Sequence, residues 1–167
     1  MNEKKIKVSA GLLMYRIIDG NLEVFLAHPG GPFFKNKDDG HWSIPKGEPD
    51  SEESDLFETA KREFEEETGI HPDAQEYISL GTILQKGGKT VHAWAFEGIL
   101  EDGYQHKSNT FKTEWPPHSG KQMMFMEIDK VEFFTVVEAK KKIKSTQIEF
   151  IEKLEKYLND KFPSPMN

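Results

Sequence analysis

The sequence predicts an α+β fold, built as an α/β/α sandwich. Strand-like segments come in pairs around turn signals, and two segments with helical periodicity each carry an apolar stripe. The length of 167 residues suits one domain that can bury a proper core. Because neither an internal repeat nor a linker interrupts the chain, we expect a single domain over residues 1–167.

The first two strands are predicted to form a hairpin. Residues 8–17 and 22–28 are strand-like and flank Asp19-Gly20-Asn21, a hairpin turn signal. Residues 29–40 form a loop with glycines and lysines that is longer than a simple connection, which suggests a functional loop. A short strand over residues 41–44 follows and ends in a glycine turn.

A helix is predicted over residues 55–68. Asp55 and Glu58 have the spacing of a capping box, and Gly69 stands where a helix commonly ends in the left-handed conformation. The apolar residues share a face beside several glutamates, so the helix can pack inward and present carboxylates at its edge. That apolar face comprises Leu56, Phe57, Ala60 and Phe64.

The second half of the chain alternates strands and helices. Residues 77–85 and 90–98 are predicted strands around a Gly-Gly turn. Residues 100–122 are expected to be irregular because Pro116-Pro117 would break a regular element. A short strand over 131–134 and a short helix over 137–143 follow.

A final helix is predicted over about residues 146–158. Thr146 and Glu149 have the spacing of a second capping box. Its apolar residues form one stripe, which predicts that the helix packs on the sheet. The stripe comprises Ile148, Ile151, Leu154 and Leu158.

Composition excludes several classes of protein. Charged residues make up 31% and hydrophobic residues 36%, yet 12 Phe, 4 Tyr and 3 Trp argue against disorder. A net charge of -7 argues against non-specific nucleic-acid binding. The absence of cysteine excludes disulfides, thiolate zinc sites and a cysteine nucleophile. With no apolar signal segment and no run of 18 apolar residues, we expect a cytoplasmic protein without a membrane partner.

Three carboxylates share one strip of the first predicted helix. Glu63, Glu66 and Glu67 stand at positions i, i+3 and i+4, so they point the same way. A pair of such charges about 6 Å apart costs roughly 3 kcal/mol at an effective dielectric of 20. A solvated acidic face is the alternative interpretation. A divalent cation such as Mg²⁺ or Mn²⁺ would turn the repulsion into coordination by oxygen.

Residues 47–70 resemble the Nudix box, Gly-x5-Glu-x7-Arg-Glu-U-x-Glu-Glu-x-Gly-U, where U is a bulky aliphatic or aromatic residue. One departure exists, because eight residues rather than seven separate Glu53 from Arg62. Counting back from Arg62 places the first glutamate of the box at Ser54, which leaves the role of Glu53 open. The matching residues are Gly47, Glu53, Arg62, Glu63, Phe64, Glu66, Glu67, Gly69 and Ile70.

The resemblance extends over roughly residues 6–158. Residues 8–13 look like the first Nudix strand, and residues 132–134 resemble the acidic-aromatic segment that follows the catalytic loop. This implies the Nudix fold, with a mixed central sheet. Three phrases are similar to a bacterial branch described as predicted NTP or dinucleoside polyphosphate pyrophosphohydrolases: HPGGPFF (28–34), GHWSIPKGE (40–48) and EWPPHSG (114–120).

The resemblance implies a metal-dependent site. Its ligands would be the carboxylates of Glu63, Glu66 and Glu67 and the backbone carbonyl of Lys46, binding one to three Mg²⁺ or Mn²⁺ ions. Arg62 would orient a glutamate. The general base would be a glutamate of the box or an acidic loop residue, and Glu127 and Glu114 are the loop candidates. A solvated loop glutamate is an equally good interpretation of Glu127.

Candidate substrate contacts follow from the same resemblance and from loop positions. Trp115 adjoins two prolines in a loop, and is favoured over Trp42 and Trp94 for stacking on a base. A solvated surface residue is the alternative for each lysine. The candidates are Lys46, Gly47, Trp115, Lys35 and His28.

The predicted function is metal-dependent hydrolysis of a pyrophosphate bond in a nucleoside diphosphate-linked small molecule. A dinucleoside polyphosphate such as diadenosine tetraphosphate leads, ahead of nucleoside triphosphates, ADP-ribose and capped RNA. A non-catalytic Nudix nucleotide-binding module and a protein whose acidic helix binds a basic partner are the competing hypotheses. Both a monomer and a homodimer are compatible with the sequence.

Overall fold

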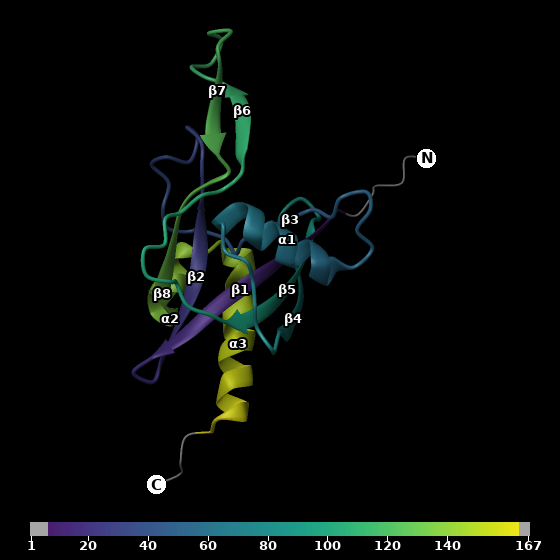
Figure 1. Cartoon of the computed structure of the whole chain (residues 1–167), viewed down its shortest axis with the longest axis vertical. Coiled ribbons are helices and arrows are strands. Elements are labelled where there is room, and N and C mark those ends of the chain that lie inside the picture. Colours follow the sequence, from purple (N-terminus) through teal and green to yellow (C-terminus); the bar gives the residue numbers. More distant parts are fainter. Residues whose placement is uncertain (1–6, 164–167) are drawn as a thin grey trace.

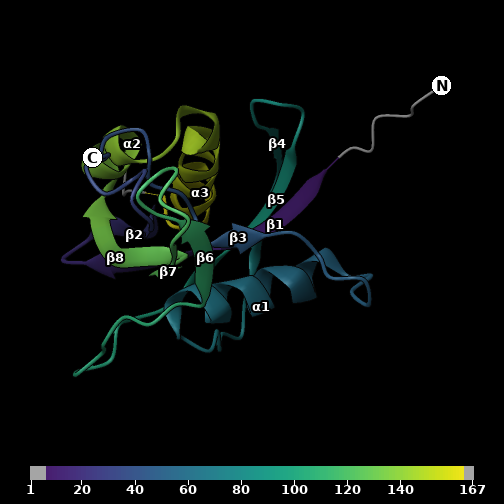
Figure 2. The same cartoon turned by 90° about the horizontal axis from the view of Figure 1, so that it is seen from above.

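A six-stranded mixed sheet lies between one helix on one face and two helices on the other (Figures 1 and 2). The computed structural model describes residues 7–163. Its strands are β1 (Val8–Ile18), β2 (Asn21–Pro29), β3 (Lys46–Gly47), β4 (Ile78–Leu84), β5 (Thr90–Glu97), β6 (Thr110–Glu114), β7 (Gln122–Met126) and β8 (Ile128–Thr135). Its helices are α1 (Leu56–Thr68), α2 (Val136–Lys142), the 3-10 turn η1 (Ser145–Gln147) and α3 (Ile148–Lys161).

The main sheet runs in the order β4-β5-β1-β2-β8, and β3 pairs with β1 beside this path. β1 and β5 are parallel, whereas β1 with β2, β4 with β5 and β2 with β8 are antiparallel. This confirms the predicted α/β/α sandwich with a mixed sheet.

Strand β1 is central because both of its faces are buried. Leu12 and Met14 pack into the cluster beneath α1, whereas Leu13 and Tyr15 pack into the cluster beneath α3. Successive side chains of a strand point to opposite faces, so one apolar run supplies both cores.

Helix α1 begins and ends as its sequence predicts. The Asp55 side chain accepts a hydrogen bond of 2.9 Å from the Phe57 amide. At the other end Gly69 has a φ of 74°, and its amide donates to the Glu65 carbonyl. Both caps fix the register of the glutamates along the helix.

Most predicted elements match the observed ones to within three residues at each end. The Asp19-Gly20 turn forms as expected, with φ values of 52° and 81°. Residues 41–44 make two isolated bridges, Ala27 with Ser43 and Trp42 with Ile143, in place of the predicted strand. No helix in residues 7–163 is long and apolar enough to cross a membrane.

The prediction of an irregular segment over residues 100–122 is wrong for residues 110–114. Residues 110–114 form β6, which pairs with β7 in a hairpin that projects from the sandwich (Figure 1). The two prolines at 116 and 117 lie in the turn between the strands, where they cost no ladder hydrogen bond.

The second predicted capping box is also wrong. The chain enters α3 through η1, and the N-cap residue is Gln147, without a side-chain cap. Gln147 is fully buried instead, and its Oε1 accepts from the Ile44 amide at 3.0 Å. Its Nε2 donates to Ser43 and to Gln85. This side chain ties the start of α3 to the strand segment that leads into β3.

Candidate functional site

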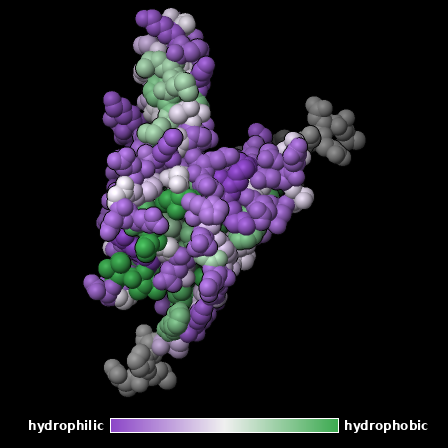
Figure 3. Space-filling view, in the orientation of Figure 1, coloured by the Kyte–Doolittle hydropathy of each residue, from purple (hydrophilic) through white to green (hydrophobic). Residues whose placement is uncertain are grey.

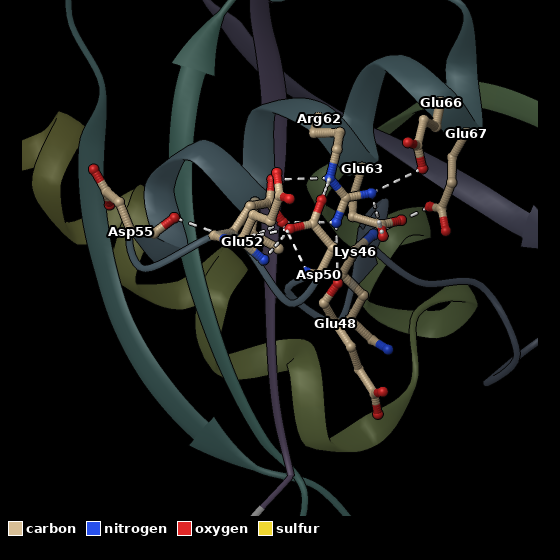
Figure 4. Close-up of polar contacts among 11 residues, drawn as sticks. Lys46, Glu48, Asp50, Glu52, Asp55, Arg62, Glu63, Glu66 and Glu67 are labelled. Atoms are coloured by element: carbon tan, nitrogen blue, oxygen red, sulfur yellow. Dashed lines mark hydrogen bonds and ion pairs between the residues drawn. The ribbon is translucent and has the colours of Figure 1, made fainter.

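Strand β3 and helix α1 bring the two ends of the glycine-to-glutamate segment together (Figure 4). The Lys46 amide donates a hydrogen bond of 3.1 Å to Glu67 Oε2. Lys46 lies opposite Gly11 in the β1–β3 ladder. The residues next to this pair are hydrogen-bonded, since the Leu12 amide donates to the Pro45 carbonyl. In an antiparallel ladder this is a pair without hydrogen bonds, so the N–H and C=O of Lys46 both point away from β1. The carbonyl therefore faces the same side as Glu67.

Gly47 is a glycine because Glu63 lies against it. A Cβ atom added to Gly47 would lie 2.1 Å from the carboxyl carbon of Glu63, closer than any real contact. The missing side chain lets the carboxylate approach the backbone of β3. Gly47 thus acts by positioning Glu63 within the site.

Arg62 is the centre of an ion-pair network (Figure 4). Its Nε and Nη2 bind both oxygens of Glu53, each at 2.9 Å. Its Nη1 donates to Glu63 and to Glu66 at 3.0 Å, and Nη2 also donates to the Glu48 carbonyl. A bidentate guanidinium–carboxylate pair with further partners fixes the geometry of all groups in it.

Glu53 is therefore the partner of Arg62, and Ser54 is an exposed residue. The extra residue is taken up in a turn, in which the Asp50 side chain accepts from the amides of Glu52 and Glu53. Hydrogen bonds from Arg62, which outweigh partial burial, lower the pKa of Glu53 to about 2.

Burial and neighbouring carboxylates disfavour the charged forms of Glu63 and Glu67. Burial, followed by the charge of Glu63, raises the pKa of Glu67 to about 8. Burial also raises the pKa of Glu63, although Arg62 opposes it. Burial lowers the pKa of Lys46 to about 8, with a further contribution from Lys89. Glu67 is thus a half-buried acid without an ion-pair partner among the described residues.

The donor set fits a hard divalent cation. Glu63, Glu66 and Glu67 each receive hydrogen bonds at one carboxylate oxygen, and within residues 7–163 the other oxygen receives none. Those oxygens and the Lys46 carbonyl are the ligand type that Mg²⁺ and Mn²⁺ prefer. In the described part of the chain no three acidic or histidine side chains already share a metal-ligand geometry, so uptake of an ion would involve side-chain rotation.

A cleft of about 160 Å³ opens beside Glu67 where β3 and β2 diverge from β1. Its wall includes Lys46, His41, Lys144 and Glu127. The cleft therefore places carboxylates and lysines next to each other.

Backbone hydrogen bonds connect Glu127, on the cleft wall, to helix α1 through Asn109. The Asn109 amide donates to the Glu66 carbonyl at 2.9 Å, and the Glu127 amide donates to the Asn109 carbonyl at 2.8 Å. The Glu127 carbonyl in turn accepts from Gly30. Glu114, the other loop candidate, lies in the projecting hairpin and caps the His118 amide.

The structure corrects the role predicted for His28. This side chain is fully buried, and its ring nitrogens bind Asp129 Oδ1 at 2.7 Å and the Lys37 carbonyl at 2.6 Å. With both nitrogens occupied inside the core, His28 holds the loop 30–41 in place and does not face the cleft. His41 lines the cleft instead.

Lys35 and Trp115 lie outside the cleft. Lys35 is exposed in the loop 30–41, and Trp115 packs edge-to-face on Phe33 at the outer end of the hairpin, with ring centroids 5.6 Å apart. Trp115 is level with Lys121 on the partner strand, and six residue steps separate Lys121 from Glu127, or roughly 20 Å. The structure therefore groups these two residues with each other and not with Glu67.

Two residues of the site escaped the sequence analysis. Lys144 comes one residue after a run of three lysines, between the two last predicted helices, and Asn109 carries no motif. Asn109 acts through its backbone alone, so its residue type carried no signal. Lys144 could have been found only from its place in the fold.

The chain matches the family model described as NUDIX domain over residues 9–154. Three solved structures share its fold. The Ap4A hydrolase of C. elegans, in a binary complex, is 22% identical with a TM-score of 0.64, over 91% of this chain and 98% of that chain. The NUDIX domain of Shewanella oneidensis NrtR, complexed with ADP ribose, is 16% identical with a TM-score of 0.65, over 93% and 90%.

The third is a mutT/nudix family protein from Listeria innocua, 16% identical with a TM-score of 0.62, over 96% of this chain and 98% of that chain. No curated protein sequence matches the chain. At these identities the likeness is one of fold.

Proposed function

This chain belongs to the Nudix family and is a pyrophosphohydrolase, and we propose that it acts on a nucleoside diphosphate-linked small molecule, with a dinucleoside polyphosphate such as diadenosine tetraphosphate as the leading candidate. The observation that carries the proposal is the cleft, where Lys46 and Lys144 line the same wall as Glu67 and Glu127. Lysines suit the phosphates of such a substrate, and the carboxylates suit the cations that accompany them.

We assign the metal to the residues whose oxygens remain available. The carboxylates of Glu63, Glu66 and Glu67 and the Lys46 carbonyl would hold one to three Mg²⁺ or Mn²⁺ ions. A bound ion would offset phosphate charge and make a water molecule more acidic. Gly47 lets Glu63 approach β3, and Arg62 positions Glu63 and Glu66 while remaining bonded to Glu53.

We assign the general base to Glu127, which would accept the proton of the attacking water. Glu127 lines the cleft and is held there through the backbone of Asn109. Glu67, whose burial raises its pKa to about 8, is the alternative base in the same cleft.

We assign Lys35 and Trp115 as contacts for the outer end of a long substrate. Trp115 would stack on a base at one end of the substrate, and Lys35 would meet phosphate charge near it. Both residues stand on the projecting loop and hairpin, so a compact substrate would not need them.

ADP-ribose is the second candidate substrate, because one structure of this fold was solved with ADP ribose bound. Nucleoside triphosphates are the third, since they offer the same phosphates to the cleft. The net charge of -7 supports a small nucleotide as partner in place of non-specific nucleic acid. The cytoplasmic location stays a prediction.

The proposal is tested by product analysis after incubation with Mg²⁺ and a substrate panel. The panel contains diadenosine tetraphosphate, the common nucleoside triphosphates and ADP-ribose, and Glu67→Gln is the matched control. ATP and AMP from the tetraphosphate, absent with the variant, would support both the chemistry and the leading substrate. Turnover of another panel member alone would replace the substrate. Tight nucleotide binding without any turnover would favour the non-catalytic binding module.

A further inference from the structure

Lys144 is held at a fixed place between α2 and α3. Its amide donates to the Trp42 carbonyl at 2.8 Å, and its carbonyl accepts from the Gln147 amide at 2.9 Å. Since Trp42 and Gln147 are both buried, the backbone of Lys144 is fastened to the core on both sides. The ammonium group is the free end of an otherwise anchored residue.

Lys144 lines two pockets. One is the cleft of about 160 Å³ that contains Glu67 and Glu127. The other, of about 290 Å³, is lined by Gln85, Lys86 and Ser145 as well. The side chain therefore lies at the boundary between this cleft and a second pocket, which has no role in the proposed reaction.

Three further lysines lie near this boundary. Lys46 lines the cleft, Lys86 lines the second pocket, and Lys89 is close enough to disfavour the charged form of Lys144. Burial first, and Lys89 second, lower the pKa of Lys144. The three come from β3 and from the turn between β4 and β5, so the fold gathers them from separate elements.

Neighbouring lysines have partners that Lys144 lacks. Lys142 pairs with Asp38 at 2.7 Å, and Lys140 pairs with Glu155 at 2.8 Å. Lys89 pairs with Glu48 at 3.5 Å. Within residues 7–163, Lys144 makes no ion pair although it is half-buried. A cation that is partly desolvated, repelled by its neighbours and left without a carboxylate lowers stability unless an anion joins it.

We propose that Lys144 binds the phosphate chain of the substrate beyond the bond that is cleaved, where the chain passes from the cleft of Glu67 into the second pocket. The ligand class is a linear polyphosphate of three or more phosphates. Lys86 and Lys89 would accompany the chain on the far side of Lys144. The inference rests on the proposed function, which supplies the nucleotide attached to the phosphate chain. The binding of inorganic polyphosphate can be measured without a nucleotide.

A consequence is selectivity for chain length. A substrate with two phosphates ends at the boundary of the cleft, whereas a longer chain passes Lys144 and enters the second pocket. Ammonium groups bind phosphate as point charges, so this contact should depend on salt and tolerate arginine in place of lysine.

The first experiment measures binding of inorganic tripolyphosphate and of pyrophosphate by calorimetry, in chelator and without nucleotide. The proteins are the full chain and its Lys144→Gln, Lys144→Arg and Lys156→Gln variants. Lys156 is an exposed lysine of α3 away from both pockets and serves as the matched control. We expect Lys144→Gln to weaken tripolyphosphate binding about tenfold or more, a loss typical of one charge-assisted contact. Lys144→Arg should restore most of it.

The result that overturns the inference is equal tripolyphosphate binding by Lys144→Gln and Lys156→Gln. An equal loss for pyrophosphate and tripolyphosphate would also overturn it, because chain length would then not matter. Thermal unfolding checks that Lys144→Gln is folded, and Lys144→Arg keeps the test valid should the neutral variant be unstable.

The second experiment separates this inference from the proposed function. Steady-state rates are measured with diadenosine triphosphate, tetraphosphate and pentaphosphate. Lys144→Gln should raise KM increasingly with chain length and leave kcat within about twofold, as expected when binding rather than chemistry is lost. If the unaltered protein hydrolyses none of them, the proposed dinucleoside polyphosphate substrate fails while calorimetry still tests Lys144. If it hydrolyses them and the variant keeps every KM, the inference alone fails.

Discussion

At the scale of single residues, the site depends on which carboxylates have a cationic partner. Glu53 is bound on both oxygens by Arg62, and Glu63 and Glu66 each share that guanidinium. Glu67 has only the Lys46 amide and is the most strongly perturbed acid of the site. The chain therefore concentrates uncompensated negative charge where an ion is needed.

The first prediction concerns activity. Glu66→Gln and Glu67→Gln should each lose several kcal/mol of transition-state stabilisation, or roughly 10²- to 10⁴-fold in kcat, because each removes a charged ligand oxygen. The fold should persist in both. Rates across a Mg²⁺ titration, with Glu65→Gln on the exposed side of the helix as control, provide the measurement. Wild-type rates and Mg²⁺ dependence in both variants would contradict the metal assignment.

The second prediction concerns stability against pH without metal. Burial raises the pKa of Glu67 from its ordinary value of 4.5 to about 8, so the folded state holds a proton there that the unfolded state releases. The free energy of unfolding should therefore fall as pH rises from about 4.5 to about 8. The slope has an upper limit of about 1.4 kcal/mol per pH unit.

Urea unfolding in chelator at several pH values measures this slope. Glu67→Gln should show a flatter curve and should be more stable than the unaltered protein near pH 8. Added Mg²⁺ should stabilise the unaltered protein most at high pH, because the ligand must be deprotonated. Parallel curves for the two proteins would show that Glu67 ionises normally.

At the scale of elements, the start of α3 holds the strand that carries Lys46. Gln147 binds the Ile44 amide, Ser43 and Gln85 at once, so one buried side chain joins the start of α3, the segment that leads into β3 and the turn after β4. Helix α1 is joined to the cleft from the other side, through Asn109 and Glu127. Each wall of the cleft is thus fixed by hydrogen bonds between elements distant in sequence.

The third prediction compares two neighbouring residues. Gln147→Ala should destabilise the fold by roughly 2–3 kcal/mol, because it leaves the buried Ile44 amide without a partner and opens a cavity. Thr146→Ala should change stability by less than about 0.5 kcal/mol, since Thr146 does not cap the helix here. Denaturant midpoints of the two variants decide the matter. A larger loss of stability for Thr146→Ala than for Gln147→Ala would support the capping box that the sequence predicts.

At the scale of the whole molecule, the sandwich and the β6–β7 hairpin are distinct parts. The hairpin extends from the sandwich, and exposed Met123, Met124 and Met126 give it an apolar surface (Figure 3). The loop 30–41 covers one side of it, where Phe33 meets Trp115 and Gly31 lies against Phe111. A two-stranded ribbon is marginal alone, so this loop stabilises it.

The fourth prediction tests whether the hairpin takes part in substrate binding. Trp115→Ala should raise KM for diadenosine tetraphosphate roughly 5- to 100-fold, the range of 1–3 kcal/mol for one stacked base. It should leave kcat and the KM for nucleoside triphosphates unchanged, because these do not reach the hairpin. Met124→Ala, an exposed change on the same hairpin, is the control. Unchanged KM for every substrate would remove Trp115 from the site.

The sequence by itself determined the fold class, helix α1 with both of its caps, and the set Glu63, Glu66 and Glu67. These depend on spacing within one element, where geometry repeats every 3.6 or every 2 residues and neighbours along the chain decide the outcome. The hairpin turn at Asp19-Gly20 follows for the same reason, because its residues alone supply the positive φ values.

Only the tertiary structure decided which distant residues meet in the cleft. It buried His28 and placed the half-buried His41 on the cleft wall, brought Glu127 and Lys144 to Glu67, and kept Trp115 away. It also showed that Glu53 binds Arg62 although eight residues separate the two. A turn takes up the extra residue, and the motif does not specify the shape of that turn. Such contacts join residues up to about a hundred positions apart, and they are set by how helices and strands pack, which no local pattern specifies.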